Sequence, residues 1–175
     1  MTILPLHPAY VLYVVEHMRR EDREEIHATS WTEDPRRLAT PLCQAGVLGA
    51  AIAARPGEQA QAIVAAVNLW PGVWNAGMFA TDRWPEVAVE TSIWLKRKFI
   101  PELRAARAHR VECHVLERYA LARRWLEWLG ATAEAVVPAF GRERETFIRY
   151  AWLSDDVPAR IIRAQHQDTG PAGAG

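Results

Sequence analysis

The chain has few cysteines, no excess of either charge and no long apolar run. Its two cysteines, Cys43 and Cys113, are too few for a disulfide framework and indicate a reducing compartment. Basic and acidic side chains both total 21, and this balance argues against electrostatic binding of nucleic acid. No window reaches the roughly 18 uninterrupted apolar residues that a membrane span needs, and the N-terminus lacks the features of a signal peptide. We expect a cytoplasmic protein that binds neither nucleic acid nor membrane.

Several functional motifs are also missing. No P-loop and no Gly-x-Ser-x-Gly elbow occurs, and no glycine lies between Met78 and Ala108. His109, Cys113 and His114 are close in sequence, but strand alternation places Cys113 and His114 on opposite faces. We therefore expect no bound metal.

Half of the 175 residues are apolar, which is enough to bury one good core. We predict a single domain over residues 1–153, followed by a C-terminal extension over 154–175. The extension has no hydrophobic periodicity. A short helix over residues 157–164 is one prediction for it, and the last eight residues, DTGPAGAG, are expected to be disordered.

The clearest pattern runs from Arg110 to Gly130. Val111, Cys113 and Val115 alternate with polar residues, as in a strand with one apolar face. A helical face then follows, and Gly130 stands where a helix ends on a residue with positive φ. This face carries Ala122, Trp125, Leu126 and Leu129.

Other segments complete an order of strand, two helices, three strands, helix, strand, helix and two strands. Asp34 and Pro35 are typical of a helix start. Strands are predicted over residues 10–15, 47–54, 62–70, 73–81, 132–140 and 145–153, and helices over 18–31, 34–46 and 85–107.

Two local features refine this prediction. In the helix predicted over residues 85–107, Pro101 indicates either a kink or two abutting helices, with Pro101 in the first turn of the second. Val89, Ile93, Ile100 and Leu103 are expected to form the apolar side of this segment. Residues 70–73, Trp-Pro-Gly-Val, favour a type II turn, and since hairpins rarely use that type, the loop is expected to exceed two residues.

Eight tryptophans are many for this length. Packing of the core and its edges explains most of them. The alternative is that one or two of them, Trp84 above all, form the wall of a ligand groove.

The element order resembles that of the GNAT acetyltransferase superfamily. In the run YALARRWLEWLGA, the family's alanine, tyrosine and glycine places correspond to Ala122, Leu126 and Gly130. The segments MRREDREEIHA and ARRWLEWLGA look like those of GNAT-like proteins of tailed bacteriophages. The resemblance covers roughly residues 8–153.

The resemblance implies an α/β (α+β) fold with a mixed, mainly antiparallel sheet of about seven strands and about four helices, split between its fourth and fifth strands. It also implies acetyl-CoA as co-substrate. The pantetheine arm would pair with the backbone of Phe79, Ala80 and Thr81, while the adenine and phosphates would lie near Arg83, Trp84, Thr91 and Ser92. The chain departs from the family in lacking its glycine-containing pyrophosphate loop.

Catalytic candidates follow from the same comparison. His114 or Glu112, on one face of the fifth strand, is a candidate base for the acceptor amine, and an unperturbed histidine titrates near pH 6.5. Leu126 replaces the family's tyrosine acid, which leaves Tyr119 as the nearby candidate. Each candidate also has a structural interpretation. His114 can be a surface histidine or one whose hydrogen bonds are satisfied, and Tyr119 can simply pack against the start of the helix.

Three functions stay open at this stage. The first is transfer of an acetyl group to an unknown amine. The second is a virion or morphogenesis role in a phage, with little or no catalysis and other virion proteins as partners, and the third is an acyl-CoA sensor. A homodimer is also left open.

Overall fold

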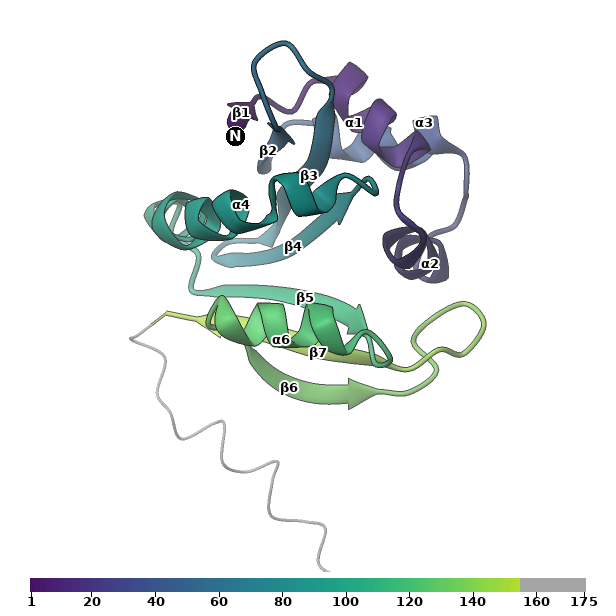
Figure 1. The fold of residues 1–175 in the computed structure, drawn as a ribbon. Helices are drawn as coiled ribbons and strands as arrows, with labels where there is room; N and C mark the ends of the chain where they lie inside the picture. The colour runs from purple at the N-terminus through teal and green to yellow at the C-terminus, as the bar shows by residue number, and fades with distance from the viewer. Residues whose placement is uncertain (155–175) are drawn as a thin grey trace, which may run out of the picture.

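The computed structural model describes residues 1–154, which form one seven-stranded sheet with helices on both faces (Figure 1). The expectations of a short helix and a disordered tail in the extension lie outside the described residues. The strands are β1 (Thr2–Leu4), β2 (Val47–Ala53), β3 (Ala60–Trp70), β4 (Val73–Ala80), β5 (Arg110–Leu116), β6 (Thr132–Val137) and β7 (Phe147–Leu153). The helices are α1 (Pro8–Glu16), α2 (Arg20–Ala28), α3 (Pro35–Ala39), η1 (Thr40–Cys43), η2 (Trp84–Glu86), α4 (Ala88–Trp94), η3 (Leu95–Phe99), α5 (Ile100–Ala105) and α6 (Ala120–Trp128).

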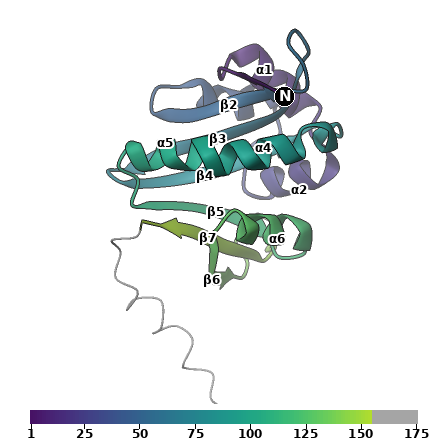
Figure 2. The same ribbon diagram turned by 60° about the vertical axis from the view of Figure 1, so that its left-hand side comes forward.

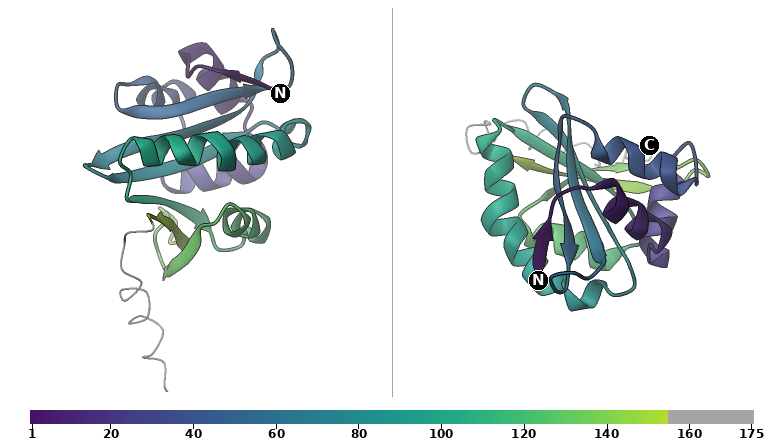
Figure 3. Two further views of the ribbon diagram at one scale, coloured as in Figure 1. Left: turned by 90° about the vertical axis from the view of Figure 1, so that its left-hand side faces the viewer. Right: turned by 90° about the horizontal axis from the view of Figure 1, so that it is seen from above.

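The spatial order of the strands is β1-β2-β3-β4-β5-β7-β6. Every neighbouring pair is antiparallel except β4 and β5, which are parallel. Helices α4, α5 and α6 lie on one face of the sheet, and α1 and α2 lie on the other (Figures 2 and 3). The predicted fold class, a mixed and mainly antiparallel sheet of seven strands, is confirmed. In residues 1–154 no helix has the length and apolar character to cross a membrane.

The strand and helix between Arg110 and Gly130 form as predicted. Val111, Cys113 and Val115 are buried, while the polar residues between them, Glu112 and His114, are half-buried. Gly130 ends α6 with a φ of +94°, a conformation that costs glycine little because it has no Cβ. Asp34 also caps α3 as expected, since its Oδ1 accepts from the backbone N–H of Arg36 at 2.9 Å.

The predicted strand over residues 10–15 is wrong, because this segment belongs to α1. Its buried residues, Val11, Val14 and Val15, follow the helical spacing of three and four. A six-residue apolar run is too short for periodicity to separate strand from helix. The missed signal lay just before it: His7 is the N-cap, and Pro8 opens the helix.

The helical segment after β4 is one rod built from α4, η3 and α5 (Figure 2). Pro101 lies in the first turn of α5, as one of the two predicted arrangements required, and the π-helical turn η3 precedes it. The predicted apolar side is partly wrong. Val89 and Ile93 are 72% and 43% exposed, whereas Leu103 is buried as predicted. The other buried residues of the rod include Ser92, Leu95 and Phe99.

The hairpin between β3 and β4 is tighter than expected. Trp70 pairs with Val73, so the loop holds only Pro71 and Gly72. The register shifts between Asn68 and Trp70, and this irregularity lets a two-residue turn with Gly72 at φ +81° join the strands. The longer loop predicted here is wrong.

Gly49 in β2 has no room for a side chain. An added Cβ would lie 2.3 Å from the carbonyl oxygen of Val64 and 2.9 Å from the Cα of Ala65, and neither backbone atom can move without distorting the β2–β3 pair. We expect Gly49→Ala to lower the free energy of unfolding by about 2 kcal/mol or more. The matched control is Gly77→Ala, whose Cβ would meet nothing within 4 Å. Urea unfolding of both variants checks this, and equal stabilities would contradict it.

Candidate active site

The sheet opens between β4 and β5. The two strands pair at only three positions, Val73–Arg110, Trp74–Val111 and Asn75–Glu112. Beyond these positions the strands separate, so the backbone groups on their facing edges need other partners or a ligand. We call this region the β4–β5 opening.

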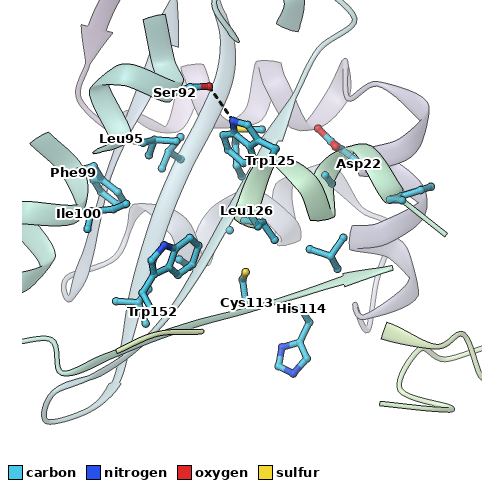
Figure 4. A pocket seen from close by; sticks show the side chains of 18 of the residues that line it. Asp22, Ser92, Leu95, Phe99, Ile100, Cys113, His114, Trp125, Leu126 and Trp152 are labelled. Atoms are coloured by element: carbon cyan, nitrogen blue, oxygen red, sulfur yellow. Dashed lines mark hydrogen bonds between the residues drawn. The ribbon is translucent and has the colours of Figure 1, made fainter. Parts of the chain in front are cut away.

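A cavity of about 830 Å³ adjoins this opening. Its walls come from the rod α4–η3–α5 on one side and α6 on the other, its floor from β4 and β5, and one end from α2 (Figure 4). A volume of this size is typical of sites for small molecules and cofactors.

Helix α2 inserts two carboxylates into the opening. Asp22 Oδ2 accepts from the backbone N–H of Ala80 in β4 at 2.6 Å, and Glu25 Oε2 accepts from that of Leu116 in β5 at 2.9 Å. Residues three apart lie on the same side of a helix, so one face of α2 reaches both separated strands. Arg19 adds to this contact, because its backbone N–H donates to the carbonyl of Ala80 at 2.8 Å.

Both carboxylates are harder to ionise than usual. Burial raises the pKa of Glu25 to about 7, although the bond from Leu116 acts in the other direction. Burial also raises the pKa of Asp22, against the opposing effect of the Arg19 guanidinium, which donates to it at 2.8 Å. Because a carboxyl with a pKa near 7 exchanges its proton at neutral pH, Glu25 is suited to general base chemistry.

An indole bridge closes the upper side of the cavity between α4 and α6. Trp125 donates its Nε1–H to Ser92 Oγ at 2.9 Å, as the dashed line in Figure 4 marks. Trp84 packs edge-on against Trp125 with ring centroids 6.1 Å apart, and the Arg19 guanidinium lies 5.8 Å from the Trp84 ring centroid. The bridge therefore joins the two helices above the sheet.

Four of the ten residues predicted from the sequence line the cavity: Trp84, Ser92, His114 and Tyr119. The lining does not include the other six, which are Phe79, Ala80, Thr81, Arg83, Thr91 and Glu112. Most of these have clear structural partners. Phe79 is buried against α1, and Thr81 donates to the buried Gln61 at 2.8 Å.

Arg83 and Thr91 are also engaged. Arg83 pairs with Glu86 at 2.7 Å and with Glu58 at 3.3 Å, and these contacts raise the pKa of its guanidinium further. Thr91 is fully buried, with its Oγ1 3.2 Å from Met1 Sδ. Neither side chain points a free polar group at the cavity.

His114 lies on the far side of β5 from α6, opposite Cys113 (Figure 4). Its ring stacks on Phe140, with centroids 4.5 Å apart, and burial lowers its pKa below the usual value. Glu112 shares this face of the strand and accepts from Arg110 Nε at 2.9 Å. Arg110 also binds Glu134 in β6, so Glu112 belongs to an ion-pair network across the sheet.

Tyr119 precedes α6 and donates its hydroxyl to Glu24 Oε2 at 2.7 Å. Burial, and then this bond, raise its pKa to about 12. Leu126 is buried in the cavity wall (Figure 4). In α6 only apolar residues face the cavity, and the one polar group among them, the indole N–H of Trp125, is already bonded.

Asp22 and Glu25 are the site residues that the sequence did not reveal. They lie in α2, a helix rich in charged residues, and their partners are 58 and 91 residues away. No local pattern predicts such contacts. In residues 1–154 no cluster of three or more potential metal ligands is present.

Comparison with known proteins gives the fold a name. No family model and no curated protein matches the sequence. Solved structures do match. A GNAT-family acetyltransferase from Bacillus anthracis is 16% identical with a TM-score of 0.64, over 86% of this chain and 93% of that one.

Two further neighbours have more specific names. The ribosomal-protein-S18-alanine N-acetyltransferase of Escherichia coli is 15% identical with a TM-score of 0.64, over 90% and 98% of the two chains. A mutant spermidine N-acetyltransferase of Vibrio cholerae is 10% identical with a TM-score of 0.67, over 87% and 95%. This chain therefore has the fold of the GNAT acetyltransferases.

Proposed function

We propose that this protein transfers an acyl group, acetyl in the simplest case, from acyl-CoA to an amine. The observation that supports this most directly is the cavity at the β4–β5 opening, with the Glu25 carboxyl at one end. Structural neighbours named as N-acetyltransferases share the fold, but at this identity the likeness concerns the fold alone. The proposed activity therefore depends on the site.

Glu25 is the base that we propose for the acceptor amine. Its ionised carboxylate would take the amine proton while nitrogen bonds to the acyl carbon and the carbon–sulfur bond breaks. The acyl thioester supplies the group that is transferred. Tyr119, whose hydroxyl now donates to Glu24, is the proposed proton donor to the leaving sulfur. His114 is a second candidate base, although its ring lies on the face of β5 that points away from α6 (Figure 4).

The placement of the pantetheine arm follows from the backbone. Ala80 has its N–H and C=O engaged by α2, so an arm along Phe79–Thr81 would have to displace Asp22 and Arg19. Met78 is directed to the same edge two residues earlier and lines the cavity, and β4 pairs with β5 only as far as Asn75. We propose Met78 as the main backbone partner.

Binding of the CoA phosphates near Arg83 and Ser92 has less structural support than binding of the pantetheine arm. Ser92 is bonded to Trp125, and Arg83 would have to leave Glu58 and Glu86 to reach a phosphate. These engaged groups, and the resemblance of the sequence to GNAT-like phage proteins, favour the second candidate function, an assembly role in a virion without catalysis. An acyl-CoA sensor is the intermediate case.

Binding of acetyl-CoA separates these candidates. A ligand at a hundred times its Kd adds about 2.7 kcal/mol to the stability of the folded state, which for a chain of this length raises Tm by about 5–10 °C. We expect such a shift with about 1 mM acetyl-CoA. ADP, which lacks the pantetheine arm, is the control and should give a much smaller shift. If acetyl-CoA gives no shift, an acetyltransferase and an acetyl-CoA sensor are both excluded; binding without turnover on a panel of amines leaves the sensor.

A further inference from the structure

The two ends of the cavity differ in chemistry. The end beneath α2 is polar, with Arg19, Asp22 and Glu25 in its wall. The opposite end, under α5 and next to the paired part of β4 and β5, is mainly apolar, although the exposed Arg104 and the half-buried Ser154 also line it. Its wall is formed by Leu95, Phe99, Ile100, Leu103, Val111 and Trp152.

The apolar end offers almost no hydrogen bonds. Trp152 donates its Nε1–H to the carbonyl of Leu129 at 3.2 Å, so only the carbon atoms of its ring are left for a ligand. Burial raises the pKa of the Cys113 thiol to about 12, so that side chain is neutral. Water needs several polar partners to occupy a cavity, and this end supplies few.

Small side chains leave the space open. Ala76 on β4, Cys113 on β5 and Ala108 before β5 all line the cavity, below the larger residues of the rod α4–η3–α5. Protein interiors are normally packed with few voids larger than a water molecule. An apolar space that small residues keep open therefore favours an apolar occupant.

The polar end orients that occupant. Arg19 lines this end, and its guanidinium, which donates to Asp22 at 2.8 Å, carries the positive charge there. A carbonyl oxygen on a ligand, such as that of a thioester, would be attracted to that charge. The cavity thus suits a molecule with a polar carbonyl at one end and a hydrocarbon chain at the other.

We propose that the apolar end binds the hydrocarbon chain of a medium-length acyl thioester, so that the natural acyl donor is longer than acetyl. This rests on the proposed function, since it names the donor used at the same site. An acetyl group has a single methyl beyond its carbonyl and would leave the space beside Phe99 and Trp152 unfilled.

The test is the affinity for CoA thioesters of two, four, six and eight carbons, measured by calorimetry without an amine. Each methylene that enters an apolar site should tighten Kd about fourfold, until the space is full. Equal Kd values along the series would overturn the proposal and leave an acetyltransferase intact.

Two variants test where the hydrocarbon chain of the ligand binds. Ala76→Leu adds volume to the cavity floor, so octanoyl-CoA should lose most of its advantage over acetyl-CoA. Ala105→Leu makes the same change on the exposed side of α5, outside the cavity lining. This variant should retain the wild-type increase in affinity with acyl length. Thermal unfolding checks that both variants fold. Loss of acetyl-CoA and octanoyl-CoA binding by the same factor in Ala76→Leu would contradict the proposal.

A probe without the nucleotide separates this proposal from the function on which it rests. If octanoyl-pantetheine binds more tightly than acetyl-pantetheine while no CoA ester binds, the acyl site is supported and CoA is excluded as the carrier. If no thioester of either kind binds at any chain length, both proposals fail.

Discussion

Glu25→Gln is expected to lower the turnover number of acyl transfer by about 10²- to 10³-fold, the usual contribution of a positioned general base. Glutamine has nearly the same shape and can still accept the backbone N–H of Leu116 through its amide oxygen. It cannot take a proton from an amine. The loss should therefore appear in the chemical step, with acyl-CoA affinity nearly unchanged.

The pH dependence of the rate identifies the base. With a pKa of about 7, Glu25 is half ionised near neutral pH, so the wild-type rate should rise as the pH passes through about 7 and then level off. This rise should be absent in Glu25→Gln. If His114 is the base, the rise would lie below pH 6.5, because burial lowers the pKa of that ring.

Three variants complete this test. Glu102→Gln changes an exposed carboxyl on α5 outside the cavity and should leave the rate unchanged. His114→Ala and Tyr119→Phe measure the two candidates taken from the sequence. Wild-type turnover in Glu25→Gln together with a large loss in His114→Ala would transfer the role of base to His114.

The second large effect of Glu25→Gln is on stability: the variant that lowers turnover is expected to raise the free energy of unfolding at high pH. The pKa of Glu25 is about 7 in the folded protein and near 4.5 in the unfolded chain, so between these values the folded state holds more protons. The contribution of Glu25 to stability is therefore fully present below about pH 4.5 and is lost as the pH rises through about 7. The difference of roughly 2.5 units corresponds to about 3 kcal/mol.

Glu25→Gln removes this loss, because an amide does not ionise. We expect its free energy of unfolding to exceed that of the wild type at pH 8, and the advantage to shrink toward pH 5. Urea unfolding of both proteins at the two pH values measures the difference. A variant that is slower but more stable would show that its loss of activity does not come from misfolding.

Glu24→Gln is the control for stability. The hydrogen bond from Tyr119, followed by those from Arg20 and Arg118, lowers the pKa of Glu24 to about 2. Since Glu24 is then ionised between pH 5 and 8 in both folded and unfolded states, its replacement should change stability equally at both pH values. Parallel curves for wild type and Glu25→Gln would mean that burial does not raise the pKa of Glu25 as inferred.

Elements with a local signature could be predicted well from the sequence. Alternation in β5, the cap at Asp34 and the stop at Gly130 depend on neighbours within a few residues, and all three are confirmed. The failures came where local patterns were ambiguous. The run over residues 10–15 is apolar on every side, and Val89 and Ile93 fit a helical stripe although tertiary packing buried another side of that helix.

By itself the sequence determined the order of elements from β2 onward, and its resemblance to the GNAT superfamily implied a sheet that separates between β4 and β5. The tertiary structure decided which side chains fill that separation. Asp22 and Glu25 meet Ala80 and Leu116 across 58 and 91 residues, because backbone N–H groups at an open strand edge require acceptors and α2 lies close enough to supply them. A contact of that range leaves no pattern in the sequence near either partner.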